Sequence, residues 1–203
     1  MAGFLFTGSA SGDFKDPVLG QGLGRVISMK EVIFMNQTHS DRVVKVDAST
    51  HERVDADAIV TTTKGLALAV LAADCLPILL LGDGAVAAVH AGRLGVESEL
   101  ITHTVDLMNK YCSKNIRAVI GPSICDDCYE VSPHMYEEFL VRRPEAATTA
   151  AKHSLDLKVA ASALLQAKGV EVSDVAICTR EDSSYFSYRR DATSKRHVGA
   201  VWL

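Results

Sequence analysis

Short apolar runs, bounded by Gly, Asn or Asp, dominate the first half of the chain. Runs of four to eight such residues are typical of β-strands. We therefore expect strands at residues 31–35, 42–46, 58–62, 66–72, 76–81 and 85–90. In Leu66–Ala72 the larger residues mostly occupy alternate positions. This alternation indicates a sheet with one tightly packed face.

The spacing of apolar residues changes to a helical period further along the chain. Within residues 96–111, Leu100, Ile101, Val105 and Met108 fall on one helical face. Residues 133–142 form a second expected helix, which opens with a proline. A third is expected at residues 155–168, with Ser154 as its N-cap and Gly169 after its last turn.

The order of these elements predicts the fold class. Further strands are expected at residues 116–120, 175–178, 185–188 and 198–203, whereas residues 1–29 are glycine-rich and predict loops around short strands. Strands therefore cluster before and after a set of helices, and single strands and helices alternate too rarely for a doubly wound fold. We expect an α+β fold, a mixed sheet or sandwich flanked by helices, in one domain over residues 1–203.

Composition narrows the class of protein and its partners. The chain is 48% apolar, which is typical of a globular protein. Its net charge of −4 does not favour binding to nucleic acid. Its N-terminus lacks a basic segment before Phe4, and no apolar run is long enough to cross a bilayer. Five cysteines, an odd number, favour reduced thiols. We expect a cytoplasmic protein without a membrane partner.

A predicted hairpin brings a thiol and an imidazole together. The turn Gly82-Asp83-Gly84 joins two apolar runs, with Cys75 at the outer end of one and His90 at the outer end of the other. A two-residue loop places Cys75 opposite His90, and a three-residue loop places it opposite Ala91. His39 lies in a loop between two expected strands, where functional side chains are common.

Three interpretations of this group remain open on spacing alone. A thiolate and two neutral imidazoles suit zinc and leave a fourth coordination position free. A thiol with a histidine base suits nucleophilic catalysis. The third interpretation is a buried free cysteine with two unrelated histidines.

A resemblance to a known family favours the first interpretation. Its motifs occur here, in order, at residues 36–39 (NQTH), 54–58 (VDADA), 73–77 (ADCLP), 89–92 (VHAG), 120–124 (IGPSI), 128–131 (CYEV) and 186–191 (FSYRRD). Together these resemble the YfiH, or laccase-domain, family, also called polyphenol oxidase or peptidoglycan editing factor. The resemblance implies a mixed α/β sandwich similar to the catalytic domain of cytotoxic necrotising factor.

The resemblance also implies a site and an activity. Its zinc ligands correspond to His39, Cys75 and His90, and copper is an alternative occupant of the same site. The implied reactions are phosphorolysis of adenosine, inosine or methylthioadenosine, and deamination of adenosine. Phosphorolysis requires groups that hold phosphate. Arg42 and Arg93, each three residues after an expected ligand, are the candidates, with Arg42 also a candidate catalytic residue. The expected partners are thus small molecules, and a monomer and a homodimer both remain open.

Some features depart from the family pattern. The family usually has His-Ala-Gly-Trp-Arg-Gly where this chain has His-Ala-Gly-Arg-Leu-Gly at residues 90–95. Two other functions therefore stay open: a Cys–His hydrolase or amidase acting on cell-wall precursors, and a scaffold without activity. Seven histidines are too few for four-copper oxidase chemistry.

Two further features are expected to be structural. Asp74 precedes the expected ligand Cys75, and a strand would point the two side chains apart. Cys125 and Cys128 form a single C-x-x-C with no second pair to complete a closed zinc site. The other possibility for Cys128, Tyr129 and Glu130 is a place at the edge of the substrate pocket.

Overall fold

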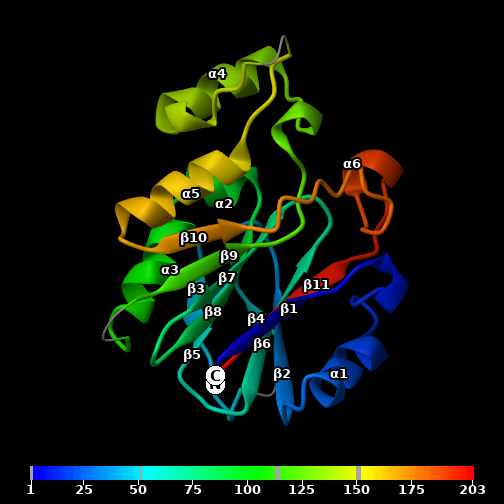
Figure 1. The fold of residues 1–203 in the computed structure, drawn as a ribbon, viewed down its shortest axis with the longest axis vertical. Coiled ribbons are helices and arrows are strands. Elements are labelled where there is room, and N and C mark those ends of the chain that lie inside the picture. The colour runs from blue at the N-terminus through cyan, green and yellow to red at the C-terminus, as the bar shows by residue number, and fades with distance from the viewer. Residues whose placement is uncertain (1, 51, 113–114, 150–151) are drawn as a thin grey trace.

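The computed structural model describes residues 2–50, 52–112, 115–149 and 152–203. In this part of the chain the strands form two mixed sheets (Figure 1). The first sheet has the strand order β1 (Gly3–Phe6), β11 (His197–Trp202), β6 (Leu66–Ala72), β2 (Glu31–Asn36) and β4 (Val54–Asp55). The second has the order β10 (Glu171–Asp174), β9 (Arg117–Ile120), β7 (Leu76–Leu81), β8 (Val86–Ala91), β5 (Ala58–Thr61) and β3 (Val43–Lys45).

Helices cover the outer faces of both sheets (Figure 1). Helix α1 (Pro17–Val26) lies against the first sheet, and the second is covered by α2 (Arg93–Glu97), α3 (Leu100–Met108) and α5 (Leu157–Ala167). The remaining helices are α4 (Pro133–Arg142) and α6 (Tyr188–Asp191), with short 3₁₀ helices at Ser9–Ser11, Asp126–Cys128 and Pro144–Ala146. Within the described residues, no helix has both the length and the apolar character needed to span a bilayer.

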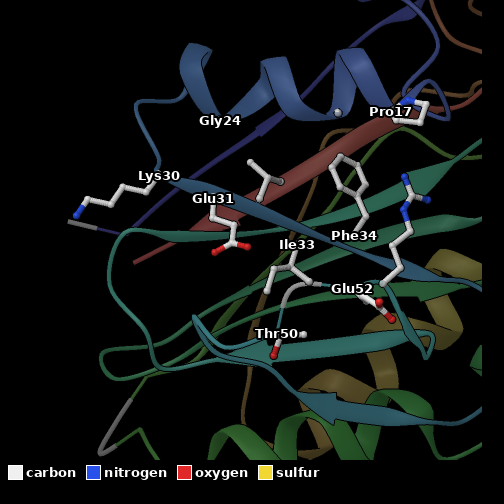
Figure 2. A pocket seen from close by; sticks show the side chains of 11 residues that line it. Pro17, Gly24, Lys30, Glu31, Ile33, Phe34, Thr50 and Glu52 are labelled. Atoms are coloured by element: carbon white, nitrogen blue, oxygen red, sulfur yellow. The ribbon is translucent and has the colours of Figure 1, made fainter.

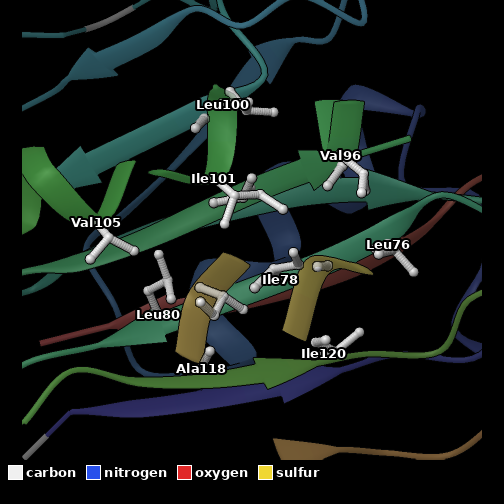
Figure 3. Packing of buried hydrophobic residues seen from close by; sticks show 14 of the residues in the cluster. Leu76, Ile78, Leu80, Val96, Leu100, Ile101, Val105, Ala118 and Ile120 are labelled. Carbon is white, nitrogen blue, oxygen red and sulfur yellow. The ribbon is translucent and has the colours of Figure 1, made fainter. Parts of the chain in front are cut away.

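Strand β7 is apolar at every position because both of its faces are buried. Ile78 and Leu80 face the helices, whereas Leu79 and Leu81 pack between the two sheets. Figure 3 shows the helix-facing side, where β7 and β9 meet Val96, Leu100, Ile101 and Val105. Strand β6 follows the predicted alternation, because Leu66, Leu68 and Val70 fill the space between the sheets.

The α+β prediction is confirmed, with corrections at several elements. The glycine-rich N-terminal segment contains helix α1, which starts at Pro17 and is capped by the side chain of Asp16. Three glycines within its ten residues weakened the helical signal. The helix expected at residues 96–111 is instead two helices, because the chain is extended at Ser98. Asp156, not Ser154, caps α5.

The C-terminal segment and the hairpin also differ from expectation. The strand expected at residues 175–178 lies earlier, as β10, and residues 185–188 lead into the short helix α6. The β7–β8 loop has four residues, since Leu81 pairs with Val86. Pro77, rather than Cys75, therefore lies opposite His90.

Candidate metal centre

His39, Cys75 and His90 converge where the ends of the two sheets meet. His39 follows β2 of the first sheet, Cys75 ends the connection from β6 of the first sheet to β7 of the second, and His90 belongs to β8. Their potential ligand atoms all lie within 4.8 Å of one another. The Cys75 Sγ to His39 Nε2 distance is 3.9 Å, and the two imidazoles meet edge to face.

The loop carrying His39 is held by its neighbours in the NQTH motif. The side-chain amide of Gln37 accepts a hydrogen bond from the Leu71 N–H and donates one to the Leu71 carbonyl, both at 2.8 Å. These bonds join the two segments beyond the last residues that pair in the sheet, Phe34 and Ala69. His39 then adopts a φ of 60°, which turns the chain sharply. A non-glycine residue in this region indicates a conformation imposed by its surroundings.

Asp57 forms hydrogen bonds beside both imidazoles. Its Oδ2 accepts hydrogen bonds from the backbone N–H groups of Thr38 and Ser40, on either side of His39. Its Oδ1 lies 2.8 Å from Nδ1 of His90, which leaves Nε2 of that ring for the site. A carboxylate behind a metal-binding imidazole fixes the ring and its tautomer. Asp57 belongs to the VDADA motif, whose sequence alone gave it no role.

These contacts determine the charge of the metal-free site. Burial opposes ionisation of Asp57, but hydrogen bonds from His90 and Ser40 outweigh it and hold its pKa well below the usual value. Burial also opposes a charge on His90, yet its bonds to Asp57 and Cys75 raise its pKa to about 9. Despite burial, hydrogen bonds from His39 and His90 lower the pKa of Cys75 to about 6. The thiolate that a metal requires is therefore favoured.

The backbone around Cys75 is positioned by Asp74. Asp74 has a φ of 88° and lies outside the strand. Its carboxylate accepts hydrogen bonds from Thr179 Oγ1 at 2.7 Å and from the Arg189 N–H at 2.6 Å. The structure thus gives Asp74 the structural contacts expected of it, although not through strand geometry.

Gly92 leaves the space that the site needs. A Cβ atom built there would lie 2.9 Å from Sγ of Cys75 and 3.2 Å from Cδ2 of His39. Its φ of −76° suits any residue, so space alone accounts for the glycine.

The donor set fits zinc. A tetrahedral ion with bonds of ~2.0–2.3 Å has ligand atoms ~3.3–3.8 Å apart, and small side-chain rotations bring the observed atoms to that spacing. One thiolate and two imidazoles also suit copper. Three protein ligands leave one position open, as in catalytic sites. No further group of imidazoles gathers among the described residues, so the ligands for a four-copper centre are not found there.

A cavity of about 320 Å³ adjoins the three side chains, all of which line it. Three cationic residues, Lys15, Arg53 and Arg196, line the same cavity. Their proximity could not be predicted from the sequence, because they come from distant segments and belong to none of the family motifs.

The two arginines expected to bind substrate lie elsewhere. Arg93 forms an ion pair with Glu97 at 2.8 Å, and Arg42 is exposed. The backbone carbonyl of Arg42 accepts the N–H groups of Asp57 and Ala58. Neither arginine is among the residues lining the cavity, and Tyr129 and Glu130 are not among them either.

A second cavity, of about 450 Å³, lies between helix α1, strand β2 and the residues Thr50, Glu52 and Arg53 (Figure 2). Phe34 points toward α1, and Ile33 points away from it. Arg53 stacks on Phe34, with its guanidinium carbon 5.0 Å from the ring centre, and lines both cavities.

Comparison with known proteins identifies related sequences. A family described as multi-copper polyphenol oxidoreductase laccase matches residues 18–203. A purine nucleoside phosphorylase of Streptomyces coelicolor is 40% identical over 181 residues, covering 85% of this chain and 75% of that protein. A purine nucleoside phosphorylase of Campylobacter jejuni is 33% identical, covering 94% of this chain and 86% of that protein.

Solved structures share the fold. A Neisseria meningitidis protein superposes with a TM-score of 0.80 at 31% identity, covering 91% of this chain and 79% of that one. YlmD of Geobacillus stearothermophilus superposes with a TM-score of 0.78 at 25% identity, covering 100% of this chain and 91% of that one. YfiH of Bacillus licheniformis, at 24% identity and a TM-score of 0.79, also has this fold; it covers 92% of this chain and 80% of that one.

Proposed function

Because the chain belongs to the multi-copper polyphenol oxidoreductase laccase family, and relatives 40% and 33% identical to it are named purine nucleoside phosphorylases, we propose that it is a metal-dependent purine nucleoside phosphorylase. The observation that carries this proposal is the cavity in which His39, Cys75 and His90 lie beside three cationic residues. The cavity thus offers a place for a metal and a place for an anion.

The ligands of the metal are proposed to be His39, Cys75 and His90, with zinc as the metal. When bound, a divalent ion there supplies a Lewis acid and an open coordination position. Asp57 keeps Nδ1 of His90 engaged, so that Nε2 faces the site. Copper is the alternative ion for the same ligands.

Lys15, Arg53 and Arg196 are proposed to hold phosphate. Guanidinium groups match the geometry of phosphate oxygens and neutralise their charge. In the reaction, a phosphate oxygen forms a bond to C1′ of the ribose while the bond from C1′ to the purine nitrogen breaks. The electron pair stays on the purine, which takes up a proton. Arg42 and Arg93 remain the alternative phosphate ligands, with Arg42 also a candidate catalytic residue.

The test is an assay of the zinc-loaded chain with inosine, adenosine or methylthioadenosine, with and without phosphate. We expect free purine base and ribose 1-phosphate, or its methylthio derivative, only when phosphate is present. Single substitutions to glutamine at Lys15, Arg53 and Arg196 are expected to raise KM for phosphate, by about tenfold for each charge-assisted hydrogen bond lost. The same change at Arg42 or Arg93 should leave KM for phosphate unchanged. Absence of base from all three nucleosides would exclude the proposal.

Adenosine deamination is a second expected reaction. The same chromatograms report it as inosine formed from adenosine without phosphate. An assay in which adenosine gives adenine but no inosine would leave phosphorolysis as the sole reaction of the pair.

The arrangement of Cys75 also supports a second candidate function. Its sulfur lies 3.9 Å from His39 Nε2, and Asp57 orients the nearby His90, as in hydrolases with a thiol nucleophile. A Cys–His hydrolase or amidase acting on cell-wall precursors would lose activity on alkylation of Cys75 and keep it with a chelator. A phosphorylase that needs the metal would lose activity in both treatments.

A further inference from the structure

A second group of potential metal ligands lies apart from the site described above. The group consists of Cys125, Cys128, Cys178 and Glu181. Each residue offers one potential ligand atom, and these atoms all lie within 4.8 Å of one another. No residue of this group lines the cavity beside His39. Cys125, Cys178 and Glu181 line a separate cavity of about 690 Å³ near α5, and Cys128 is buried beside them.

The topology of the second sheet brings these residues together. Strands β9 and β10 are parallel neighbours, so the segments that follow them leave the sheet at the same edge. Cys125 and Cys128 follow β9, and Cys178 and Glu181 follow β10. A single parallel bridge between Ser123 and Cys178 keeps the two segments paired beyond the strands.

The two segments carry matching patterns. Residues 125–128 are Cys-Asp-Asp-Cys and residues 178–181 are Cys-Thr-Arg-Glu, so a C-x-x-C meets a C-x-x-E. Cys178 and Glu181 therefore lie beside the C-x-x-C, which was expected to stand alone. Residues 178–181 do not stand out as a partner of this motif, because their last potential ligand is a carboxylate and because they lie far along the chain from residues 125–128.

The contacts within the group resemble those around a bound metal. The Cys125 N–H donates to Sγ of Cys178 at 3.4 Å, and Cys128 Sγ lies 3.5 Å from Oε1 of Glu181. A tetrahedral zinc ion sets sulfur and oxygen ligands ~3.5 Å apart and two sulfurs ~3.8 Å apart.

We propose that Cys125, Cys128, Cys178 and Glu181 bind a structural zinc ion. Three thiolates and a carboxylate complete a tetrahedral shell, so no position is left for substrate. This closed set contrasts with the three ligands at His39, Cys75 and His90. Asp126 and Asp127 line the same cavity and add negative charge that favours a cation. A metal displaces the thiol protons when it binds.

The position of this second site indicates what a bound ion does for the protein. Thr179, next to Cys178, donates to Asp74, which precedes the proposed ligand Cys75. The guanidinium of Arg190 donates to the Thr179 carbonyl at 2.6 Å, and that of Arg180 to the Cys128 carbonyl at 3.4 Å. An ion joining residues 125–128 to 178–181 therefore braces the segment behind Cys75.

The first experiment counts zinc in the folded chain. The protein is purified under reducing conditions, loaded with zinc, dialysed and measured by native mass spectrometry. We expect two ions in the unchanged chain, one in Cys178→Ser, one in Cys75→Ser and two in Cys112→Ser, the control. Cys112 is a free thiol in neither group. Two ions in Cys178→Ser, or a single ion that Cys75→Ser removes, would overturn the proposal.

A second experiment uses the unchanged chain, in case Cys178→Ser does not fold. The zinc-loaded protein is alkylated before and after chelation, and the modified cysteines are identified by peptide mass. We expect Cys125, Cys128 and Cys178 to react only after chelation, and Cys112 to react equally in both. Equal reactivity of the three cysteines before and after chelation, or a disulfide between Cys125 and Cys178 in freshly purified protein, would contradict a zinc site.

Discussion

Asp57 influences the site more than its absence from the ligand set indicates. One carboxylate oxygen accepts hydrogen bonds on both sides of His39, and the other bonds His90. Asp57 is fully buried, so these hydrogen bonds replace those that its carboxylate would form with water. Removing its charge thus changes the surroundings of two proposed ligands at once.

We predict that Asp57→Asn lowers zinc affinity at the first site by about 10–100-fold, the usual cost of losing such a carboxylate. Competition with a chromophoric chelator measures the change. Asp55→Asn is the matched control, since Asp55 is exposed and accepts a hydrogen bond from Asn36. Equal zinc affinity in the two variants would show that Asp57 does not orient the ligands.

Gly92 provides a test of space rather than charge. We predict that Gly92→Ala lowers zinc affinity at least about tenfold, because its Cβ displaces Cys75 or His39 and weakens a coordination bond. In Gly22→Ala, the new methyl group meets no atom within 4 Å in α1. That control should keep its zinc affinity and gain about 0.5–1 kcal/mol of stability in urea unfolding. Unchanged zinc affinity in Gly92→Ala would refute the steric argument.

A side chain from a distant segment stabilises the break between helices α2 and α3. Arg143, which follows α4, donates to the carbonyls of Val96, Glu97 and Ser98 at 2.9–3.4 Å. These carbonyls lie at the end of α2, where no helical N–H reaches them. The guanidinium thus stabilises the C-terminal end of α2, the helix that follows the strand bearing His90.

We predict that Arg143→Ala lowers the free energy of unfolding by about 1–3 kcal/mol, because it leaves these carbonyls without their charged donor. Urea denaturation measures the loss. Arg142→Ala should stay within about 0.5 kcal/mol of the unchanged chain, since Arg142 is exposed and its nearest ion-pair contact is 3.7 Å. Equal losses in both variants would contradict a capping role.

The free energy of unfolding depends on pH through the buried side chain of His197. His197 begins strand β11, which lies between β1 and β6, is fully buried and meets Tyr185 edge to face. Burial lowers its pKa to about 4 from 6.5, although the Pro122 backbone and the charge of Asp74 favour the protonated form. Between these two values the unfolded chain takes up a proton that the folded chain refuses, so acid favours unfolding.

We predict that the metal-free protein loses about 2 kcal/mol more stability between pH 7 and pH 5 than a His197→Gln variant does. The extra loss follows from the lowered pKa, since glutamine does not titrate. Urea unfolding at the two pH values measures both slopes. Parallel slopes for the two proteins would show that His197 titrates normally in the fold.

Much of the architecture was predictable because it is local. Apolar periodicity predicted β2, β3 and the strands from β5 to β9, but not the two-residue strand β4, and the alternation in β6 indicated its packed face. The Gly-Asp-Gly turn placed Cys75 and His90 in one neighbourhood, although the loop has four residues and not the two or three expected. These features depend on neighbouring residues in the chain, which a pattern records directly.

The arrangement in space required the fold itself. Helix α1 was hidden because packing against the first sheet offsets the poor helical propensity of its glycines. The partners of Asp57, the cations at Lys15, Arg53 and Arg196, and the meeting of Cys128 with Glu181 all depend on which strands become neighbours. Sheet order is set by long-range burial over the entire chain, and no local pattern of residues encodes it.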